Sequence, residues 1–436
     1  MKIALIAVSG VRVRNTLLDV HNVTLPGFVH RGKTIASLPS LGLLTLAGLT
    51  PAGHELRYFD MPELDTTVLE GEQFDLAAIS ALTAKVDVAY AIAGALRARG
   101  TKVVIGGLHA KMLPREVARH ADAVAVGEGE DLWPRIVEDA ARGTLKRFYV
   151  EDAPGTYDLA RSPLPRFDLL DMTRYNRITV QTSRGCPHDC EFCAASKLFG
   201  RYRRKPVDLV LRDVDAVRAR WERPMLEFAD DNTFADPKWG QELLRGLAGR
   251  GVRWFTETDS SLGRHPELLD LLAPAGCRQL LIGFESPRAA SLQGLDAQNW
   301  KLRQLDGYRR DIEAIQSRGV SVNGTFIVGL DADNPDVFEK IERFVRESGL
   351  AEVQVTALTP FPGTRLHARL AAEGRLLTRK YWDRCTLFDA TFHPKNMTLE
   401  QLEDGMNWLF GKLYNDRAVA ERKRRFLAMV RARRAG

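Results

Sequence analysis

The sequence predicts an α/β protein with three parts. These are an N-terminal doubly wound parallel sheet of the Rossmann type, a partial (β/α)6 barrel of the TIM type and a helical C-terminal segment. Two observations predict this fold class. Short, mostly apolar runs alternate with helical patterns along most of the 436 residues, and the alternation is broken once, at residues 151–175. Strands that are nearly all apolar are typical of parallel sheets covered by helices on both faces.

The first part of the chain is expected to form five strands and three helices. The strand-like runs are KIALIAV (2–8), ELRYFDM (55–61), DLAAISAL (75–82), KVVIGG (102–107) and DAVAVGEGE (122–130). Helical patterns cover 38–53, 85–100 and 130–143, and each begins or ends with Pro, Gly or Asp in a capping position. A doubly wound sheet binds ligands at the carboxyl ends of its strands, which here carry SALT (80–83), GGLH (106–109) and GEGE (127–130).

Residues 151–175 contain three prolines and no clear period, which predicts an ordered linker. Alternation then resumes with six strand-like runs: RITVQTSRGC (177–186), MLEFADDN (225–232), WFTETDSS (254–261), LLIGFES (280–286), VNGTFIVGL (322–330) and EVQVTALTP (352–360). A helical segment follows each. Six β/α units are fewer than the eight of a closed barrel, and the chemistry of such barrels lies at the carboxyl ends of the strands. The predicted boundaries are 1–145 for the first domain, 146–175 for the linker, 176–370 for the barrel and 371–436 for a helical C-terminal domain.

Three of the five cysteines lie together after the first barrel strand, as Cys186, Cys190 and Cys193, and the other two, Cys277 and Cys385, lie alone. This pattern does not predict a disulfide framework and favours a metal site. Iron–sulfur clusters are held by thiolates at such close spacings. A four-iron–four-sulfur cluster on three thiolates keeps one iron free for a small ligand. Structural zinc is the alternative, and it would need a fourth ligand from one of the lone cysteines or a distant histidine.

The motif CPHDCEFC on the first strand of a six-unit barrel resembles the radical S-adenosylmethionine superfamily. The resemblance implies that the open iron is chelated by the amino and carboxylate groups of S-adenosylmethionine. It further implies that reductive cleavage gives a 5′-deoxyadenosyl radical, which abstracts hydrogen from a substrate. Phe192, just before the last cysteine, matches the aromatic residue that the family places near the adenine.

Other strand ends match the family position by position. EFADDN supplies Asp230, Asp231 and Asn232 at the second-strand site where the family binds the methionyl amino group, and a carboxylate can accept from an ammonium there. Glu285 in IGFES matches the fourth-strand position that reaches polar groups of S-adenosylmethionine. Gly324, which opens GTFIVGL, matches the fifth-strand adenine contact, where a small residue allows close approach of the backbone.

The N-terminal sheet and its three loops resemble the cobalamin-binding domain fused to many radical S-adenosylmethionine proteins. A hydroxyl and bare glycine backbone suit the nucleotide tail of cobalamin. The residues expected to contact it are Ser80, Leu82, Gly106, Gly107, Gly127 and Glu128. The stretches 360–376 and 392–415 resemble the tail of a large subgroup that includes C-methylating enzymes of hopanoids and other natural products, so the resemblance covers nearly the whole chain.

One motif departs from the cobalt-ligating pattern Asp-x-His-x-x-Gly of the mutases. Asp19 and His21 are present, but Thr24 replaces the glycine and the motif lies about ten residues beyond the first strand. We therefore do not expect His21 to ligate cobalt, and His30 and His109 are open candidates.

The leading interpretation is a cobalamin-dependent radical S-adenosylmethionine enzyme that methylates an unactivated carbon of a small-molecule or lipid natural product. Cyclisation or rearrangement on the same scaffold is the alternative. An RNA-modifying enzyme is disfavoured because the first cysteine is Cys186, whereas that branch carries three more in its N-terminal domain. A non-catalytic cobalamin sensor is the remaining hypothesis. Candidates for the substrate pocket are Tyr381, Trp382, Cys385 and His393.

The net charge of +6 is mild for this length, so we expect no nucleic-acid partner. The basic terminus ERKRRFLAMVRARRAG (421–436) predicts a solvated helix, with contact to an anionic or membrane-bound partner as the alternative. The longest apolar stretches are too short to cross a bilayer and there is no signal-peptide pattern, which predicts a cytoplasmic protein. The resemblance also implies an electron donor such as flavodoxin or ferredoxin.

Overall fold

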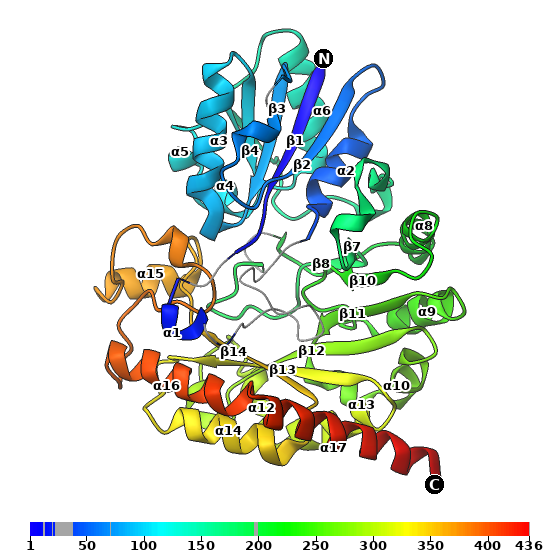
Figure 1. Ribbon diagram of the computed structural model, residues 1–436, viewed down its shortest axis with the longest axis vertical. Coiled ribbons are helices and arrows are strands. Elements are labelled where there is room, and N and C mark those ends of the chain that lie inside the picture. The colour runs from blue at the N-terminus through cyan, green and yellow to red at the C-terminus, as the bar shows by residue number, and fades with distance from the viewer. Residues whose placement is uncertain (12–13, 20, 22–37, 70, 196–198, 436) are drawn as a thin grey trace.

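The computed structural model describes residues 1–11, 14–19, 21, 38–69, 71–195 and 199–435. It contains two six-stranded parallel sheets, one above the other in Figure 1, with helices around both. A short antiparallel ribbon of two strands, β8 (Ser183–Arg184) and β9 (Arg203–Arg204), lies between them. The predicted fold class, a Rossmann-like sheet followed by a partial barrel and a helical C-terminus, is confirmed.

The first sheet has the strand order β2-β1-β3-β4-β5-β6, and all its pairs are parallel. Its strands are β1 (Lys2–Val8), β2 (Glu55–Asp60), β3 (Leu76–Ala81), β4 (Lys102–Gly106), β5 (Ala123–Val126) and β6 (Phe148–Val150). The sequence predicted the first five. It missed β6, which falls in the segment predicted as linker. β6 is an edge strand of three residues in which only the central Tyr149 is buried, so it carries no apolar run.

Helices cover both faces of this sheet. The three predicted helices are α2 (Leu41–Leu49), α3 (Val86–Ala98) and α6 (Gly129–Ala141). Two core clusters show that α3 packs on one face while α2 and α6 pack on the other. Three short helices were not predicted: α1 (Thr16–Asp19), α4 (Leu108–Met112) and α5 (Pro114–Val117).

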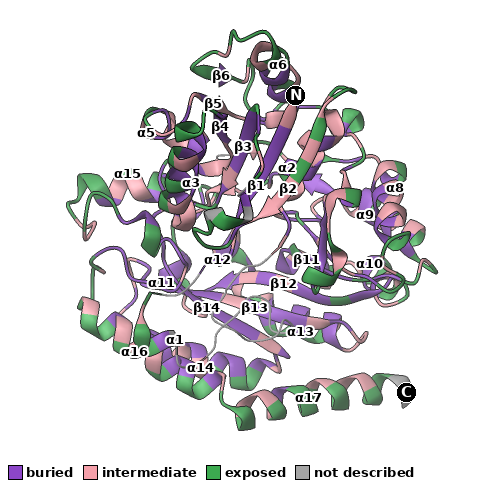
Figure 2. Ribbon diagram, turned by 45° about the horizontal axis from the view of Figure 1, so that its top comes forward, coloured by how far each residue is buried: buried purple, intermediate pink, exposed green. Residues whose placement is uncertain are grey.

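The second sheet has the order β14-β13-β12-β11-β10-β7, so strands consecutive in the barrel are neighbours, as a (β/α)6 partial barrel requires. Its strands are β7 (Ile178–Val180), β10 (Met225–Phe228), β11 (Arg253–Thr258), β12 (Cys277–Glu285), β13 (Ser321–Val328) and β14 (Glu352–Ala357). The larger helices around it are α8 (Val207–Arg218), α9 (Pro237–Leu247), α10 (Pro266–Leu272), α13 (Tyr308–Gln316), α14 (Val337–Ser348) and α15 (Arg365–Ala372), with short α11 (Ala289–Leu292) and α12 (Trp300–Gln304) between β12 and α13. The strands are buried and the outer faces of the helices are exposed (Figure 2).

The C-terminal part is helical only from α16 (Leu399–Leu413) onward, followed by α17 (Asp416–Ala435). The prediction of a helical domain from residue 371 was wrong for residues 374–398, which form turns and one short 3-10 helix at Trp382–Arg384. A capping box fixes the start of α16, because Thr398 and Gln401 each bond the other's backbone N–H. α16 packs on α14, and α17 runs along the lower edge of the molecule in Figure 1.

The contact between α14 and α16 gives a test of packing. A Cβ atom on Gly405 of α16 would lie 2.0 Å from Cε2 of Phe338, whereas at Gly411 on the same helix the nearest atom, Cε1 of His21, is 3.9 Å away. We expect Gly405→Ala to destabilise the fold by about 1–3 kcal/mol through overpacking. Gly411→Ala is the matched control and should stabilise the helix by up to about 1 kcal/mol. Thermal midpoints should shift in opposite directions, and a Gly405→Ala midpoint at or above wild type would contradict this packing.

Candidate active site at the facing sheet edges

The carboxyl ends of both sheets border two neighbouring cavities. One cavity, of about 460 Å³, is lined by the ends of all the barrel strands except β7, which contributes through the loop that follows it. The other, of about 350 Å³, is lined by the ends of β3, β4 and β5 and by α2 and α6. Gln181, Arg184 and Ala229 of the barrel side also reach the second cavity. Polar groups from two domains therefore converge on adjoining spaces, which is how ligand sites are commonly built.

The three clustered cysteines line the barrel cavity. Cys186, Cys190 and Cys193 lie on the loop between β8 and β9, and the Cys193 N–H donates to the Cys190 carbonyl at 3.1 Å. Gly185 starts this loop at φ +80°, and a Cβ there would lie 2.6 Å from the Arg201 carbonyl oxygen, so the close approach needs glycine. Burial raises the pKa of the Cys186 thiol to about 11 and that of Cys190 to about 12. Metal binding here would therefore release protons.

The arrangement of thiols disfavours the zinc alternative. Cys277 begins β12 at the opposite end of the barrel and is fully buried, and Cys385 is buried in the core of the first domain. Within the part of the chain that the structure describes, no three His, Cys, Asp or Glu side chains are grouped as ligands of a single metal ion. A four-iron cluster does not need that grouping, because each thiolate binds a different iron.

Two adjacent aspartates at the end of β10 have different roles. The Asp230 carboxylate accepts from the N–H groups of Thr182 and Ser183, both at 2.9 Å, and from the hydroxyl of Thr233 at 2.7 Å. These bonds fix the segment that leads to the cysteine loop. Asp230 does not line the cavity, so in this structure its carboxylate contacts the chain and not the space where the amino group was expected. Asp231 does line the cavity and accepts from the Gly185 N–H at 3.1 Å. Burial and the neighbouring Asp230 raise the pKa of Asp231 to about 6.

Three further predicted residues line the same cavity. Asn232 donates to Asp259 at 2.8 Å, and Phe192 lies on the cysteine loop. Glu285 has φ +63°, an uncommon conformation for a residue with a side chain, and its carboxylate pairs with Lys301 at 2.8 Å. Backbone strain of this kind is typical of functional sites. The pair places a buried cation beside the cysteines, because the Lys301 ammonium and the Cys190 thiol interact electrostatically.

Gly324 lies outside the cavity. A Cβ on this residue would lie 2.8 Å from Leu350 and 3.1 Å from Phe284. The position that a side chain would take therefore points into the packed layer between the strand and its helices and away from the cavity. The β13 residues that face the cavity are Thr325 and Ile327. The motif match placed the residue on the right strand, but alternation of side chains along a strand sends Gly324 to the opposite face.

Sequence reasoning missed several polar residues inside the barrel. Glu227 pairs with Arg177 at 2.5 Å, and the buried Oε1 of Gln354 accepts no hydrogen bond from the residues that the structure describes. Glu257 lines the cavity and its side chain is exposed there, and partial desolvation inside the barrel, with the nearby carboxylates, raises its pKa to about 8. The sequence signal is the glutamate inside the strand-like run WFTET.

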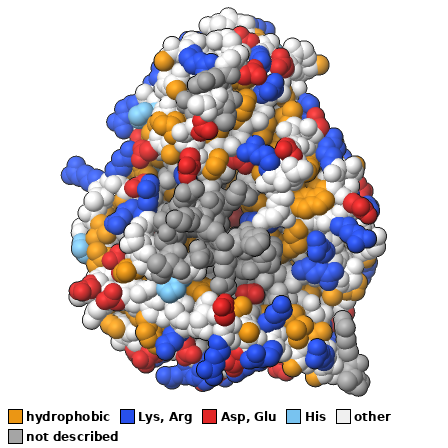
Figure 3. Space-filling model, viewed as in Figure 1, with side chains coloured by type: hydrophobic (Ala, Val, Ile, Leu, Met, Phe, Trp, Pro, Cys, Tyr) orange, Lys and Arg blue, Asp and Glu red, His pale blue; other side chains and the backbone are white. Residues whose placement is uncertain are grey.

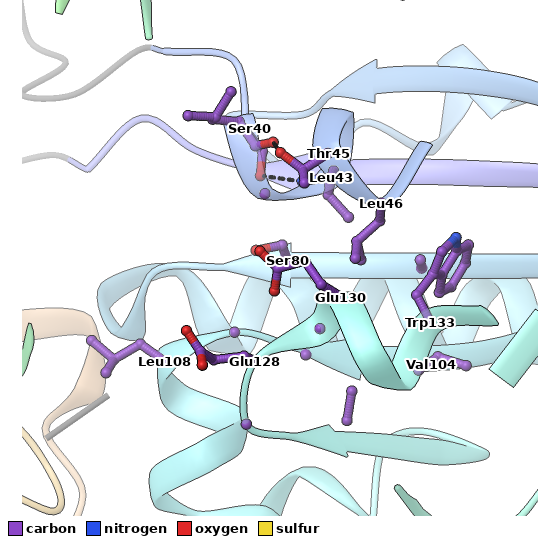
Figure 4. A pocket seen from close by; sticks show the side chains of 18 of the residues that line it. Ser40, Leu43, Thr45, Leu46, Ser80, Val104, Leu108, Glu128, Glu130 and Trp133 are labelled. Carbon is purple, nitrogen blue, oxygen red and sulfur yellow. Dashed lines mark hydrogen bonds between the residues drawn. The ribbon is translucent and has the colours of Figure 1, made fainter. Parts of the chain in front are cut away.

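The second cavity lies between the first sheet and its flanking helices α2 and α6 (Figure 4). Three of the residues predicted from the sequence line this cavity, and they lie at or just after strand ends: Ser80, Gly106 and Gly107. Gly107 has φ +95°, so its glycine is required by the backbone itself. Leu82 is 45% exposed and lies outside the cavity, because the chain turns away after β3.

The GEGE loop borders this cavity, but its first glycine and first glutamate are engaged with protein. A Cβ on Gly127 would lie 2.3 Å from the side chain of Glu151, which explains the glycine without a ligand. The Glu128 carboxylate accepts from the guanidinium groups of Arg184 and Arg203. Its expected contact with a cofactor is therefore taken by two arginines.

Two of the three histidine candidates, His21 and His109, lie away from both cavities. His21 Nε2 is 2.8 Å from the Asn407 side-chain oxygen and its ring lies edge-on to Phe410, so it packs on α16. His109 is buried beside Glu116, with 3.5 Å between its Nε2 and Oε1 of the glutamate. His30 lies outside the described residues.

The four residues predicted for a substrate pocket do not line either cavity. Tyr381, Trp382 and Cys385 pack in the core of the first domain. The backbone of His393 pairs with Arg375 in the turn region. Leu387, at φ +72°, reaches the barrel cavity instead.

Comparison with known families assigns both halves of the chain. Residues 180–345 match the radical SAM superfamily, residues 32–137 match the B12 binding domain, and residues 364–436 match a domain of unknown function, DUF4070. The bacteriochlorophyllide d C-12(1)-methyltransferase of Chlorobaculum tepidum is 28% identical over 394 residues, which cover 88% of this chain and 84% of that protein. The hopanoid C-2 methylase of Rhodopseudomonas palustris is 27% identical over 354 residues, which cover 78% of this chain and 64% of that protein.

Two solved structures share the fold. The radical S-adenosylmethionine methyltransferase TsrM from Kitasatospora setae, with tryptophan and an S-adenosylmethionine analogue bound, superposes with a TM-score of 0.68 at 16% identity and covers 100% of this chain and 99% of that one. The cobalamin-dependent enzyme OxsB gives a TM-score of 0.70 at 14% identity, with 99% and 71% of the two chains covered.

Glu257 makes the stability of the protein without cofactors depend on pH. Its carboxyl pKa rises from 4.5 to about 8 on folding, so between these values the folded state holds a proton that the unfolded state has lost. The contribution of Glu257 to the free energy of unfolding is therefore greatest below about pH 4.5 and falls as the pH rises towards 8. Because the Glu257 side chain is exposed to the cavity, solvent screening reduces this effect. We expect Glu257→Gln to raise the thermal midpoint slightly at pH 8.5 and to leave it unchanged at pH 4.5. Glu313→Gln, on the exposed face of α13, is the control, and an unchanged pH slope in Glu257→Gln would contradict the raised pKa.

Proposed function

The chain belongs to the radical S-adenosylmethionine superfamily and carries a B12-binding domain ahead of its radical domain, and from this premise we propose that it methylates an unactivated carbon of a natural product or lipid. The observation that supports this proposal best is the adjoining pair of cavities at the facing sheet edges. The methyl donor and the hydrogen-abstracting centre would then act on one substrate held between them.

The cofactors are a four-iron–four-sulfur cluster, S-adenosylmethionine and cobalamin. When bound, the cluster and S-adenosylmethionine supply the radical chemistry, and cobalamin supplies the methyl group. We assign the cluster to Cys186, Cys190 and Cys193, because their loop presents all three thiols to one cavity and the fourth position has no cysteine among the described residues.

Polar groups around the cysteines suit S-adenosylmethionine. We assign its amino group to Asp231, which has oxygen lone pairs free beyond its one bond from Gly185. Glu285 and Lys301 present a carboxylate and an ammonium to the same space, which suits the ribose hydroxyls and the methionyl carboxylate. Phe192 offers a ring to the adenine.

The first-domain cavity suits the tail of cobalamin. Its inner wall is apolar, from Leu43, Leu46, Val104 and Ile136, and its rim carries the Ser80 hydroxyl and the bare backbone of Gly106. An aromatic base with a polar linkage fits that distribution. The histidines described above lie elsewhere, so we propose that this chain supplies no histidine from residue 21 or 109 to cobalt.

We propose a largely apolar substrate. Leu358, Phe361 and Leu387 line the barrel cavity on the side of the C-terminal segment, and the named relatives act on a bacteriochlorophyllide and on hopanoids. A small-molecule substrate agrees with these relatives. No observation favours cyclisation, RNA modification or a sensor role over methyl transfer.

We further propose an external one-electron donor such as flavodoxin or ferredoxin and a reducing, cytoplasmic setting for the cluster. Within the described residues no helix is long and apolar enough to cross a bilayer. Lys and Arg side chains gather along the lower edge of the face in Figure 3, where α14 and α17 lie, and Lys423, Arg424 and Arg425 are exposed. This basic edge could meet an acidic donor or an anionic membrane surface.

The cluster assignment predicts how the five cysteines differ. Changing Cys186, Cys190 or Cys193 to Ala should remove most of the iron after anaerobic reconstitution and abolish formation of 5′-deoxyadenosine, because each thiolate holds one iron. Cys277→Ala and Cys385→Ala are the matched controls and should keep both. Equal loss of iron in the controls would contradict the three-ligand assignment.

With S-adenosylmethionine deuterated at its methyl group, a candidate bacteriochlorophyllide or hopanoid should gain the labelled methyl, whereas a product without label would favour cyclisation or rearrangement.

The cobalamin assignment predicts the effect of filling the first-domain cavity. Ala125 on β5 lines this cavity, so Ala125→Leu should weaken retention of hydroxocobalamin after desalting by about tenfold or more, which is about 1.4 kcal/mol. Ala125→Ser has nearly the size of alanine and should retain cobalamin. The visible spectrum of bound cobalamin measures both, and equal retention by the two variants would contradict the site.

A further inference from the structure

A buried network of two carboxylates and two guanidinium groups joins the two domains. Arg184 donates to Glu128 at 2.7 Å and to Glu130 at 2.6 Å, and Arg203 donates to both oxygens of Glu128 at 2.8 and 2.9 Å. Glu128 and Glu130 lie at the start of α6 in the first domain. Arg184 and Arg203 lie opposite each other on β8 and β9. We name these four residues the interdomain clamp.

The clamp lies at both ends of the cysteine loop. Arg184 lies two residues before Cys186, and Arg203 lies ten residues after Cys193. Because β8 and β9 pair through these two arginines, the loop is closed at its base, and one carboxylate of the first domain contacts both of its ends. The position of the loop relative to the first sheet therefore depends on Glu128.

The clamp is largely buried and balanced in charge. Arg184, Glu128 and Glu130 are each more than nine-tenths buried, and two negative groups face two positive ones. The Arg184 guanidinium also lies over the rings of Phe199 and Tyr157, at 5.6 and 6.0 Å. A buried ion pair is weak evidence for stability, but its directional bonds permit one register where an apolar contact would permit sliding.

The clamp also touches the cavity assigned to cobalamin. Glu128, Glu130 and Arg184 all line that cavity, and Phe199 lies beside them. The tie between the domains therefore lies between the cavity of the first domain and the loop that carries the three cysteines.

We propose that the interdomain clamp fixes the cysteine loop at a set distance from the first-domain cavity, so that Glu128, Glu130, Arg184 and Arg203 act as positioning residues for methyl transfer. This inference rests on the proposed function. The four side chains touch no reacting atoms. Their role is to hold two reaction centres in one relative position, on which the coupling of hydrogen abstraction to methyl transfer depends.

The mechanical part is tested on the full chain without any cofactor. Hydrogen exchange of peptides within 183–204 should be about tenfold faster in Glu128→Gln than in wild type, because the loop loses its tie, while peptides of α9 and α13 should not change. Asp131→Asn, which removes a surface pair with Arg161 one residue beyond Glu130, is the matched control and should exchange like wild type. Unchanged exchange in Glu128→Gln would overturn the inference.

The functional part uses protein loaded with cluster and cobalamin. Pulsed electron paramagnetic resonance between the reduced cluster and cob(II)alamin should give one narrow distance distribution in wild type and a broader one in Glu128→Gln and Arg184→Lys. Product formed per 5′-deoxyadenosine should fall about tenfold when it is measured on variant protein that carries the same amounts of iron and cobalamin as wild type. Glu130→Gln removes one bond only and serves if Glu128→Gln does not fold; it should shift both measurements in the same direction by a smaller amount.

The remaining outcomes separate this inference from the proposed function. A variant with loss of cobalamin but wild-type loop exchange would make Glu128 a cofactor contact and overturn the clamp. Distance distributions and product ratios equal to those of wild type in all three variants would also overturn the clamp. If wild-type protein retained no cobalamin, the proposed function would fail, and the exchange measurement would still decide whether the clamp holds the loop.

Discussion

The facing of two parallel sheet edges is the constraint on which the rest of this structure depends. In a parallel sheet all carboxyl ends lie at one edge, and polar residues can end each strand there without entering the core. Here two such edges border adjoining cavities, so the cysteine loop and the acids of β10 and β12 lie close to the GGLH and GEGE loops of a different domain. Neither sheet alone could supply both a radical centre and a methyl donor.

The carboxylates near the two cavities fall into two groups according to how many hydrogen bonds protein groups donate to them. Asp230 accepts four hydrogen bonds, from the backbone N–H groups of Thr182 and Ser183 and from the hydroxyls of Thr182 and Thr233, which uses its lone pairs in holding the chain. Asp231, the next residue, points to the cavity with a pKa raised to about 6 by burial and by Asp230. The same division separates Glu128, which is paired with two arginines, from Glu257, whose carboxylate has no hydrogen bond from the residues that the structure describes. Carboxylates without protein cations in a cavity favour a cationic ligand, and S-adenosylmethionine carries a sulfonium and an ammonium.

The predictions succeeded where a periodic signal spans a whole element and failed where the environment of one side chain decides. Apolar runs located eleven strands and the three main helices of the first domain, and cysteine spacing located a loop whose three thiols line the barrel cavity. The edge strand β6 has too few buried residues to give a run. Gly324 and Leu82 lie on the predicted strands or loops but face away from the cavities, because a shift of one position reverses the side. The sequence predicts Tyr381 and Trp382 as pocket residues, but they pack against a domain more than 200 residues earlier in the chain, a contact that no local pattern indicates.

The C-terminal segment explains why those aromatics are buried there. Trp382 donates through Nε1 to Glu116 of α5 at 3.0 Å, and Lys380 pairs with Asp87 of α3 at 2.6 Å, so this segment crosses from the barrel to the first domain. Asp389, a few residues on, accepts from the N–H groups of Arg14 and Asn15 just after β1. The two domains are thus joined on one side by this segment and on the other by the arginines beside the cysteine loop. Because the second attachment is built on directional charged bonds, it can set the separation of the two cavities without filling the space between them.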